Sequence, residues 1–202
     1  MPIEIETPHG PARVSVETVV DARGVLVLGH GAGGGVAARD LVTAAAAARA
    51  AGLASALIEQ PYRVAGRRSP APAAQLDAAW LAVVDHLRAS GLAAGALVVG
   101  GRSSGARVAC RTAAASGADA VLCLAFPLQP PARAGKAPGP SRLPELDAVR
   151  VPMLIVQGEN DRFGMPEAGP NREVAVVKGD HSLRSDREAI SIAVEKWLTK
   201  LG

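Results

Sequence analysis

Aromatic residues and cysteines are scarce in this 202-residue chain. Phe, Trp and Tyr together make up 2% of it, so Ala, Val and Leu must fill most of the core. The same scarcity leaves few flat side chains on which nucleic-acid bases could stack. The only cysteines, Cys110 and Cys123, both lie in apolar runs, which is typical of small buried hydrophobic residues rather than of a disulfide framework.

The chain also lacks an excess of charge of one sign and a long apolar run. It has 22 Lys and Arg against 19 Asp and Glu, and its basic residues are scattered apart from Arg67 and Arg68. Because nucleic-acid binders normally gather basic residues on one face, we expect no nucleic-acid partner. No apolar run reaches the roughly 20 residues of a membrane helix, and the opening MPIEIETPHG lacks the basic and then apolar order of a secretory signal. We therefore expect no membrane contact and a cytoplasmic protein.

What the chain does have is an alternation of strand and helix patterns. Residues 3–17 alternate between apolar and polar, which predicts a β-hairpin with one exposed face, and residues 24–29 form the continuous apolar run of a strand buried on both faces. Further strands are expected at 54–58, 96–99, 120–125, 152–157 and 173–177, and helices at 37–51, 73–89, 104–115, 143–149 and 187–201. This order predicts one α/β domain over residues 1–202, with a mostly parallel sheet of about seven or eight strands covered by helices on both faces.

Two segments have the composition of loops. Residues 61–72 are rich in turn residues, and residues 129–144 are rich in Pro, Gly and basic residues without an apolar period. The second segment lies between elements of one sheet, so it is not expected to separate two domains.

Ser103 lies in the motif Gly101-Arg102-Ser103-Ser104-Gly105, directly after the strand at 96–99 and before a helix. The spacing G-x-S-x-G has a physical reason, because a serine exposed on a sharp strand-to-helix turn needs small neighbours two residues away on either side. An ordinary glycine-rich turn between a strand and a helix could have the same sequence pattern. The specific evidence for a nucleophile is that the motif lies directly between a strand and a helix. Ser103 is therefore a candidate nucleophile.

Two further turns supply partners for such a serine. A serine hydroxyl needs an adjacent base, and that base needs a carboxylate that fixes its tautomer. His181 follows the last predicted strand and is the only histidine downstream of Ser103. Asp161 follows the strand at 152–157, with Glu159 as the rival carboxylate closer to the strand end. In a parallel sheet these strand ends meet at one edge, where ligands bind.

A fourth turn, from His30 to Gly35, follows the strand at 24–29. Its small residues allow backbone N–H groups to approach a developing oxyanion, although an anion-binding nest has a similar composition. The spacing of the glycines does not fit a dinucleotide fingerprint with a matching acid, and no Lys followed by Ser or Thr completes a phosphate loop.

These turns resemble those of the α/β-hydrolases, in particular the small members without a cap that are similar to dienelactone hydrolase. The matching stretches, in chain order, are LVLGHGAGGG, VVGGRSSGARVA, LAFPLQPP, PMLIVQGENDRFG and VKGDHSL. The order nucleophile, acid, base is also the one that α/β-hydrolases use. The resemblance extends over residues 14–197 and implies an α/β-hydrolase fold with an N-terminal antiparallel hairpin and no cap.

For the site, the resemblance implies Ser103 as nucleophile, Asp161 as acid and His181 as base. It also implies an oxyanion hole made by the backbone N–H of Ser104 and that of Ala32 or Gly33. Dienelactone hydrolases have a cysteine where this chain has a serine. Many relatives carry a helical cap after the strand at 120–125, but residues 129–144 are too few for one. We therefore expect an open site, roofed in part by this Pro-rich loop.

The predicted function is hydrolysis of an ester, thioester or lactone of a small molecule by a serine hydrolase. Arg102 and His30 are candidate substrate contacts, Arg102 because guanidinium matches the geometry of a carboxylate. A salt bridge to a neighbouring loop is the alternative for Arg102. No cofactor and no metal are expected, since no His and Cys cluster has ligand spacing.

Two other functions stay open at this point. A catalytically idle binding or scaffold module would have the same fold, because fold and function separate. A nucleotide-binding protein would use the turn from His30 to Gly35, although its phosphate-loop signature is incomplete.

Overall fold

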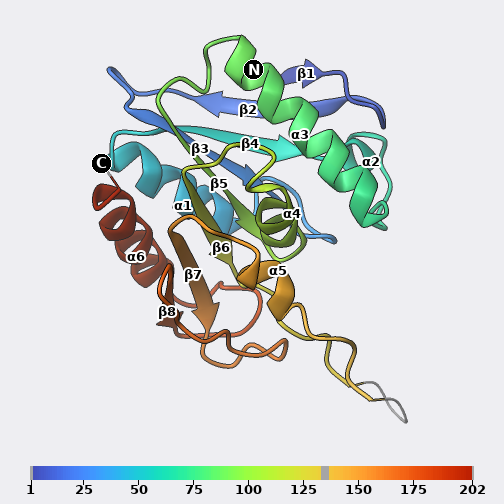
Figure 1. Ribbon diagram of the computed structural model, residues 1–202, viewed down its shortest axis with the longest axis vertical. Coiled ribbons are helices and arrows are strands. Elements are labelled where there is room, and N and C mark those ends of the chain that lie inside the picture. The colour runs from blue at the N-terminus through green and yellow to red at the C-terminus, as the bar shows by residue number, and fades with distance from the viewer. Residues whose placement is uncertain (1, 133–136, 202) are drawn as a thin grey trace.

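The computed structural model describes residues 2–132 and 137–201. Its centre is an eight-stranded sheet with the strand order β1-β2-β4-β3-β5-β6-β7-β8 (Figure 1). The strands are β1 (Ile3–Ile5), β2 (Ala12–Glu17), β3 (Gly24–Gly29), β4 (Ala54–Glu59), β5 (Ala96–Arg102), β6 (Ala120–Leu124), β7 (Met153–Gly158) and β8 (Arg172–Val177). β2 pairs antiparallel with β1 and with β4, and every other pairing in the sheet is parallel. The predicted N-terminal hairpin and mostly parallel sheet are confirmed.

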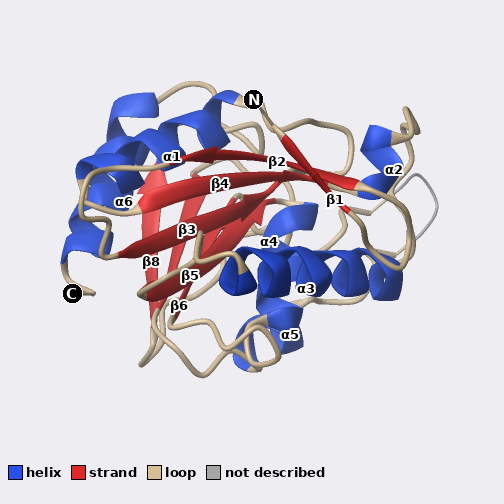
Figure 2. Cartoon of the chain, turned by 90° about the horizontal axis from the view of Figure 1, so that it is seen from above, coloured by secondary structure: helices blue, strands red, loops and turns tan. Residues whose placement is uncertain are grey.

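Helices cover both faces of the sheet. They are α1 (Arg39–Ala50), α2 (Pro61–Val64), α3 (Ala73–Ala89), α4 (Ser104–Thr112), α5 (Leu143–Asp147) and α6 (Arg187–Thr199). Figure 2 shows α1 and α6 on one face of the sheet and α3, α4 and α5 on the other. No helix of the described residues combines the length and the apolar character needed to cross a membrane.

Two apolar layers form the core, one on each face of the sheet. Trp80 of α3 is fully buried in the layer that also contains α4 and α5. Trp197 of α6 is buried in the other layer, where four alanines of α1 (Ala44, Ala45, Ala47 and Ala48) pack with it. The central strands β3, β6 and β7 are buried along their whole length, as their continuous apolar runs predict.

The segment at 61–72, predicted as a loop, begins with the one-turn helix α2. Pro61 is the first residue of this helix, where its fixed φ fits the helix and its missing N–H costs nothing. The Pro, Gly and Arg residues that follow α2 give the whole segment the composition of a turn. In addition, a helix of four residues is too short to show an apolar period in the sequence.

The Pro-rich loop at 129–144 lies between β6 and α5, and its residues 133–136 are outside the described residues. Hydrogen bonds close the base of the loop: Gly139 N–H donates to the Pro130 carbonyl at 3.1 Å, and Arg142 N–H donates to the Leu128 carbonyl at 2.7 Å. Figure 1 shows its described parts projecting away from the rest of the molecule. The Gln129 N–H, at the start of the loop, also donates to the Phe163 carbonyl in the turn after β7, at 2.8 Å. Because the described parts of the loop beyond this bond project away from the strand ends, they do not form the expected partial roof.

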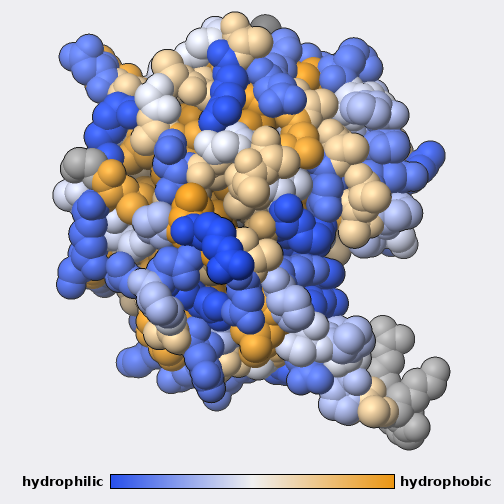
Figure 3. All heavy atoms as spheres, in the orientation of Figure 1, coloured by the Kyte–Doolittle hydropathy of each residue, from blue (hydrophilic) through white to orange (hydrophobic). Residues whose placement is uncertain are grey.

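Hydrophilic side chains cover most of the face shown in Figure 3, and apolar atoms appear there as small separated areas. The carboxyl ends of β3, β5, β7 and β8 are each followed by one of the four turns singled out in the sequence. Because these strands run parallel, the four turns meet at one edge of the sheet.

Candidate active site

Ser103 occupies a strained turn between β5 and α4. Its backbone has φ 51° and ψ −105°, a region that residues other than glycine rarely adopt. Its N–H donates to the carbonyl of Leu124 at the end of β6, at 2.9 Å. Strain of this kind persists only where the surroundings enforce it, and it occurs mostly at functional sites.

The two glycines of the motif allow this turn to pack against β3. A Cβ atom on Gly101 would lie 2.5 Å from the carbonyl oxygen of Gly29, and one on Gly105 would lie 2.2 Å from the same oxygen. Both distances are far below van der Waals contact, so no side chain fits at either position. The expected need for small residues two positions either side of Ser103 is confirmed.

His181 links Ser103 to Asp161 by hydrogen bonds. Its Nε2 lies 3.0 Å from Ser103 Oγ, and its Nδ1 lies 2.8 Å from Asp161 Oδ2. A carboxylate accepts only, so Nδ1 carries the proton and Nε2 is left to accept from the serine hydroxyl. Glu159 is exposed, and its carboxylate accepts from the neighbouring Asn160 at 3.4 Å. Of the two carboxylates that the sequence left open, Asp161 is the one that contacts the histidine.

Asp161 is held by two groups that sequence reasoning did not identify. The buried Gln157, on β7, donates from Nε2 to Asp161 Oδ2 at 2.8 Å and also to the Phe126 and Gly164 carbonyls. The Phe163 N–H donates to Asp161 Oδ1 at 2.9 Å, and the Phe163 ring lies 4.3 Å from the His181 ring, centroid to centroid. Gln157 is a single polar residue inside an apolar strand, which is the signal that could have revealed it.

The turn after β3 lies beside Ser103: a Cβ atom on Gly31 would be 3.7 Å from the Ser103 Cβ. Among the described residues, the N–H groups of Ala32, Gly33 and Ser104 donate to no protein acceptor. The hydroxyl of Tyr62, on α2, donates to the Ala32 carbonyl at 2.9 Å. Because a trans peptide points its C=O and N–H in opposite directions, this bond also fixes the direction of the Gly33 N–H. Sequence reasoning missed Tyr62, which belongs to no motif.

Arg102 contacts α1 and the turn that contains His181. Its Nε forms an ion pair with Asp40 Oδ2 at 2.8 Å, and its Nη2 donates to the His181 carbonyl at 3.1 Å. Arg102 thus forms a salt bridge, the alternative weighed in the sequence, although its partner lies on a helix and not on a loop, and a substrate contact at Arg102 stays a prediction. Asp40, on α1, is only 1% exposed, and this burial raises its pKa, an effect that the positive charge of Arg102 opposes.

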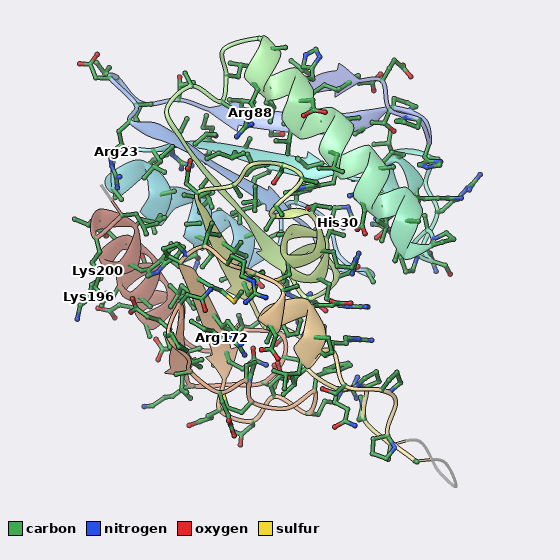
Figure 4. All side chains as sticks on the ribbon, in the orientation of Figure 1. Arg23, His30, Arg88, Arg172, Lys196 and Lys200 are labelled. Carbon is green, nitrogen blue, oxygen red and sulfur yellow. The ribbon has the colours of Figure 1, made fainter. Side chains whose placement is uncertain are left out.

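The expectation of a substrate contact at His30 does not fit the structure. The side chain is buried at the end of β3, near α4 (Figure 4). Its Nδ1 donates to the Gly31 carbonyl at 2.8 Å, and its Nε2 accepts from the Gln60 N–H at 3.1 Å. Both ring nitrogens are thus occupied by backbone groups. Burial lowers the pKa of His30, so the ring is a neutral structural group.

Within the described residues, no group of three or more His, Cys, Asp or Glu side chains could hold a metal ion. Cys110, in α4, and Cys123, in β6, are both buried, with their sulfur atoms 3.5 Å apart. Burial and their mutual contact raise the pKa of Cys123 well above its usual range, the contact being the larger cause, so this thiol stays protonated. The prediction that both cysteines are small buried residues is confirmed.

A family model described as an alpha/beta hydrolase domain matches residues 22–196. A comparison with curated protein sequences gives no significant match. Among solved structures, a serine hydrolase without a lid from Xanthomonas campestris is 19% identical, with a TM-score of 0.73, and the match covers 98% of this chain and 94% of that one. Est1E from Butyrivibrio proteoclasticus is 16% identical, with a TM-score of 0.77, and the match covers 99% of this chain and 98% of that one.

The chain belongs to the α/β-hydrolase domain family, since the family model matches most of its length. It is a hydrolase at the level of that family. The sequence resemblance to small uncapped members is confirmed, and so is the fold without a cap that it implied.

Proposed function

We propose that the protein is a serine hydrolase that cleaves an ester, thioester or lactone of a small molecule, with Ser103 as nucleophile, His181 as base and Asp161 as its carboxylate partner. The observation that carries this proposal is the unbroken hydrogen-bond chain from Asp161 through His181 to Ser103, with Ser103 on a strained turn. The predicted cytoplasmic location stays a prediction from the sequence.

In the proposed reaction, His181 Nε2 takes the proton of Ser103 as Oγ attacks the substrate carbonyl carbon. Asp161 holds the ring in the required tautomer and stabilises the imidazolium that forms. The tetrahedral oxyanion accepts from the N–H of Ser104 and that of Ala32 or Gly33, each key donor contributing about 3–4 kcal/mol. His181 then protonates the leaving group, and water repeats the sequence on the acyl-enzyme.

Two features of the site support this chemistry. The N–H groups of Ala32, Gly33 and Ser104 donate to no protein acceptor among the described residues and so are available to a carbonyl oxygen, and Tyr62 holds the peptide between Ala32 and Gly33. Arg102 ties the backbone of His181 to the serine turn itself, so base and nucleophile keep their separation. Preorganised groups of this kind lower the barrier because they need no rearrangement during the reaction.

The test is hydrolysis of 4-nitrophenyl butyrate by the wild type and by Ser103→Ala, His181→Ala and Asp161→Asn. We expect the serine and histidine variants to lose at least about 1,000-fold in kcat, because each removes a reacting group. The matched controls are Ser69→Ala and His86→Ala, which change an exposed serine and an exposed histidine that belong to none of the four turns. Equal rates in wild type and Ser103→Ala would refute the proposal.

A further inference from the structure

A hollow of about 550 Å³ lies beside the proposed catalytic groups. Its wall includes Gly33 from the turn after β3, Arg39 and Asp40 from the start of α1, Arg102 from the serine turn, and Ser182 and Arg184 from the histidine turn. This volume falls in the range of about 300–1,000 Å³ that is usual for small-molecule sites. Three of the turns that build the proposed active site therefore also build this space, called here the arginine hollow.

The arginine hollow carries a surplus of positive charge. Three arginines and one carboxylate line it, and Arg102 is ion-paired with that carboxylate, Asp40. In the part of the chain that the structure describes, no ion pair involves Arg39 or Arg184. The nearby Asp180 is bound by the N–H of Ser182 at 2.8 Å and by its hydroxyl, outside the wall of the hollow. Two guanidinium groups are thus left to face a ligand.

The arginine hollow adjoins the turns that carry the proposed catalytic groups. Gly33, one of the two residues proposed for the second oxyanion donor, lines the hollow. Arg102 lines it too, and its Nη2 lies 3.1 Å from the carbonyl oxygen of His181. Ser182 follows His181 directly. A substrate whose carbonyl reacts at Ser103 therefore has room to extend one of its two halves into the hollow.

We infer that the arginine hollow is a subsite for an anionic group, a carboxylate or a phosphate, on the half of the substrate that extends from the reacting carbonyl. Arg39 and Arg184 bind this group, while Arg102 stays committed to Asp40 and to the histidine turn. Guanidinium groups suit both anions, because their forked donors match the oxygen pairs of either one. This inference rests on the proposed function, since it assigns a substrate class to the same site.

The first test compares pairs of esters with the same carbon skeleton, of which one member carries a carboxylate and the other a neutral group. In the acyl half, mono-4-nitrophenyl glutarate is set against 4-nitrophenyl pentanoate. In the leaving group, 4-acetoxybenzoate is set against 4-acetoxybenzamide. We expect the wild type to favour the anionic ester of one pair by about tenfold or more in kcat/KM. In the double variant Arg39→Gln/Arg184→Gln, the ratio of the two kcat/KM values should fall about tenfold, mainly because KM for the anionic ester rises. Arg68→Gln, which removes an exposed charge elsewhere, should keep the ratio.

The second test needs no turnover. Calorimetric titrations of Ser103→Ala with glutarate and with inorganic phosphate measure binding of the anion itself, and the stronger of the two identifies the group. Adding Arg39→Gln and Arg184→Gln should weaken that binding about tenfold or more. Hydrolysis of the neutral esters with no anionic preference in either pair would overturn the subsite while leaving the proposed function intact. Absence of all hydrolysis would remove the proposed function, and titrations unchanged by the arginine substitutions would then remove the subsite independently.

Discussion

Tyr62, the only tyrosine of the chain, acts on the site through a backbone carbonyl and not through its own chemistry. Burial raises its pKa above the usual value of 10.0, so the hydroxyl stays a donor at neutral pH. The bond to the Ala32 carbonyl holds the turn whose N–H groups we assign to the oxyanion hole. Tyr62 is therefore a positioning residue.

We expect Tyr62→Phe to lower kcat by about tenfold with little change in KM, because the oxyanion donor is misaligned only when charge develops on the oxygen. The free energy of unfolding should fall by about 1 kcal/mol, the usual contribution of one hydrogen bond. Steady-state kinetics and urea unfolding measure the two effects separately. An unchanged kcat together with the expected loss of stability would assign Tyr62 a purely structural role.

His30 gives the stability of the fold a defined dependence on pH. Burial is the largest cause that lowers its pKa below 6.5, and the Gly31 carbonyl opposes it. Above pH 6.5 the ring is neutral in both the folded and the unfolded chain. As the pH falls below that value, His30 binds a proton in the unfolded chain but stays neutral in the folded chain. Stability therefore decreases with falling pH until the folded-state pKa is reached.

The measurement is urea unfolding of the wild type and of His30→Gln between pH 7.5 and 5. His30→Gln should be less stable at pH 7.5, and the difference between the two proteins should shrink as the pH falls, by up to about 1.4 kcal/mol for each pH unit of the lowered pKa. Taking the difference between the two proteins cancels the pH dependence that both share. A difference that stays constant with pH would contradict the assignment of a buried neutral ring.

At the residue scale, motifs identified the groups that we propose to react but not the groups that hold them. Ser103, Asp161 and His181 each follow a strand, so their meeting at one sheet edge could be predicted. The roles of Asp40 and Tyr62 could not be predicted. The burial of Asp40 depends on the packing of α1, and the contact of Tyr62 depends on the position of α2 in the fold. Arg102 was expected to bind substrate because guanidinium matches the geometry of a carboxylate, and its ion-pair partner Asp40 could not be predicted because it lies far away in the sequence.

At the scale of elements, the close packing of α4 against β3 depends on a glycine of the serine motif. Gly105 lies in the first turn of α4, where alanine would ordinarily favour the helix by about 1 kcal/mol over glycine. Here a Cβ would lie 2.2 Å from the Gly29 carbonyl oxygen, at the end of β3. The packing of helix on strand therefore outweighs helix propensity.

Gly105→Ala should lower the free energy of unfolding by about 1–3 kcal/mol and reduce ester hydrolysis, because α4 must move away from β3 and carry Ser103 with it. The matched control is Gly35→Ala: a Cβ at Gly35 meets no atom within 4 Å, so its stability should stay within about 0.5 kcal/mol of the wild type. Chemical unfolding of both variants measures the contrast. If Gly105→Ala proved as stable as Gly35→Ala, the close approach would not govern this turn.

The element pattern was predictable where a strand is buried on both faces or a helix has a long apolar period. β3, β6 and β7 are continuous apolar runs, and α3 and α6 have the expected stripes of buried residues. The helix α2 has too few residues for a period. The direction of the loop at 129–144 depends on hydrogen bonds at its base, which composition does not reveal.

For the whole molecule, we propose that the chain folds as one domain, because a single sheet supplies one wall of both apolar layers. Trp80 reports on one layer and Trp197 on the other. In Trp80→Phe and Trp197→Phe, the fluorescence of the remaining tryptophan and the circular dichroism of the helices should therefore lose their native signals at the same urea concentration. Fluorescence and circular dichroism midpoints that separate in either variant would show that the two layers unfold independently.

The central claim is that His181 and Asp161 activate Ser103. Its most direct test is incubation of the folded protein with a fluorescent fluorophosphonate, followed by mass spectrometry of the labelled peptides. The wild type should carry one adduct, on Ser103, and Ser103→Ala and His181→Ala should stay unlabelled while folding normally. No adduct on a well-folded wild type, or an adduct of equal rate in His181→Ala, would contradict an activated serine and point to a binding module on the same fold.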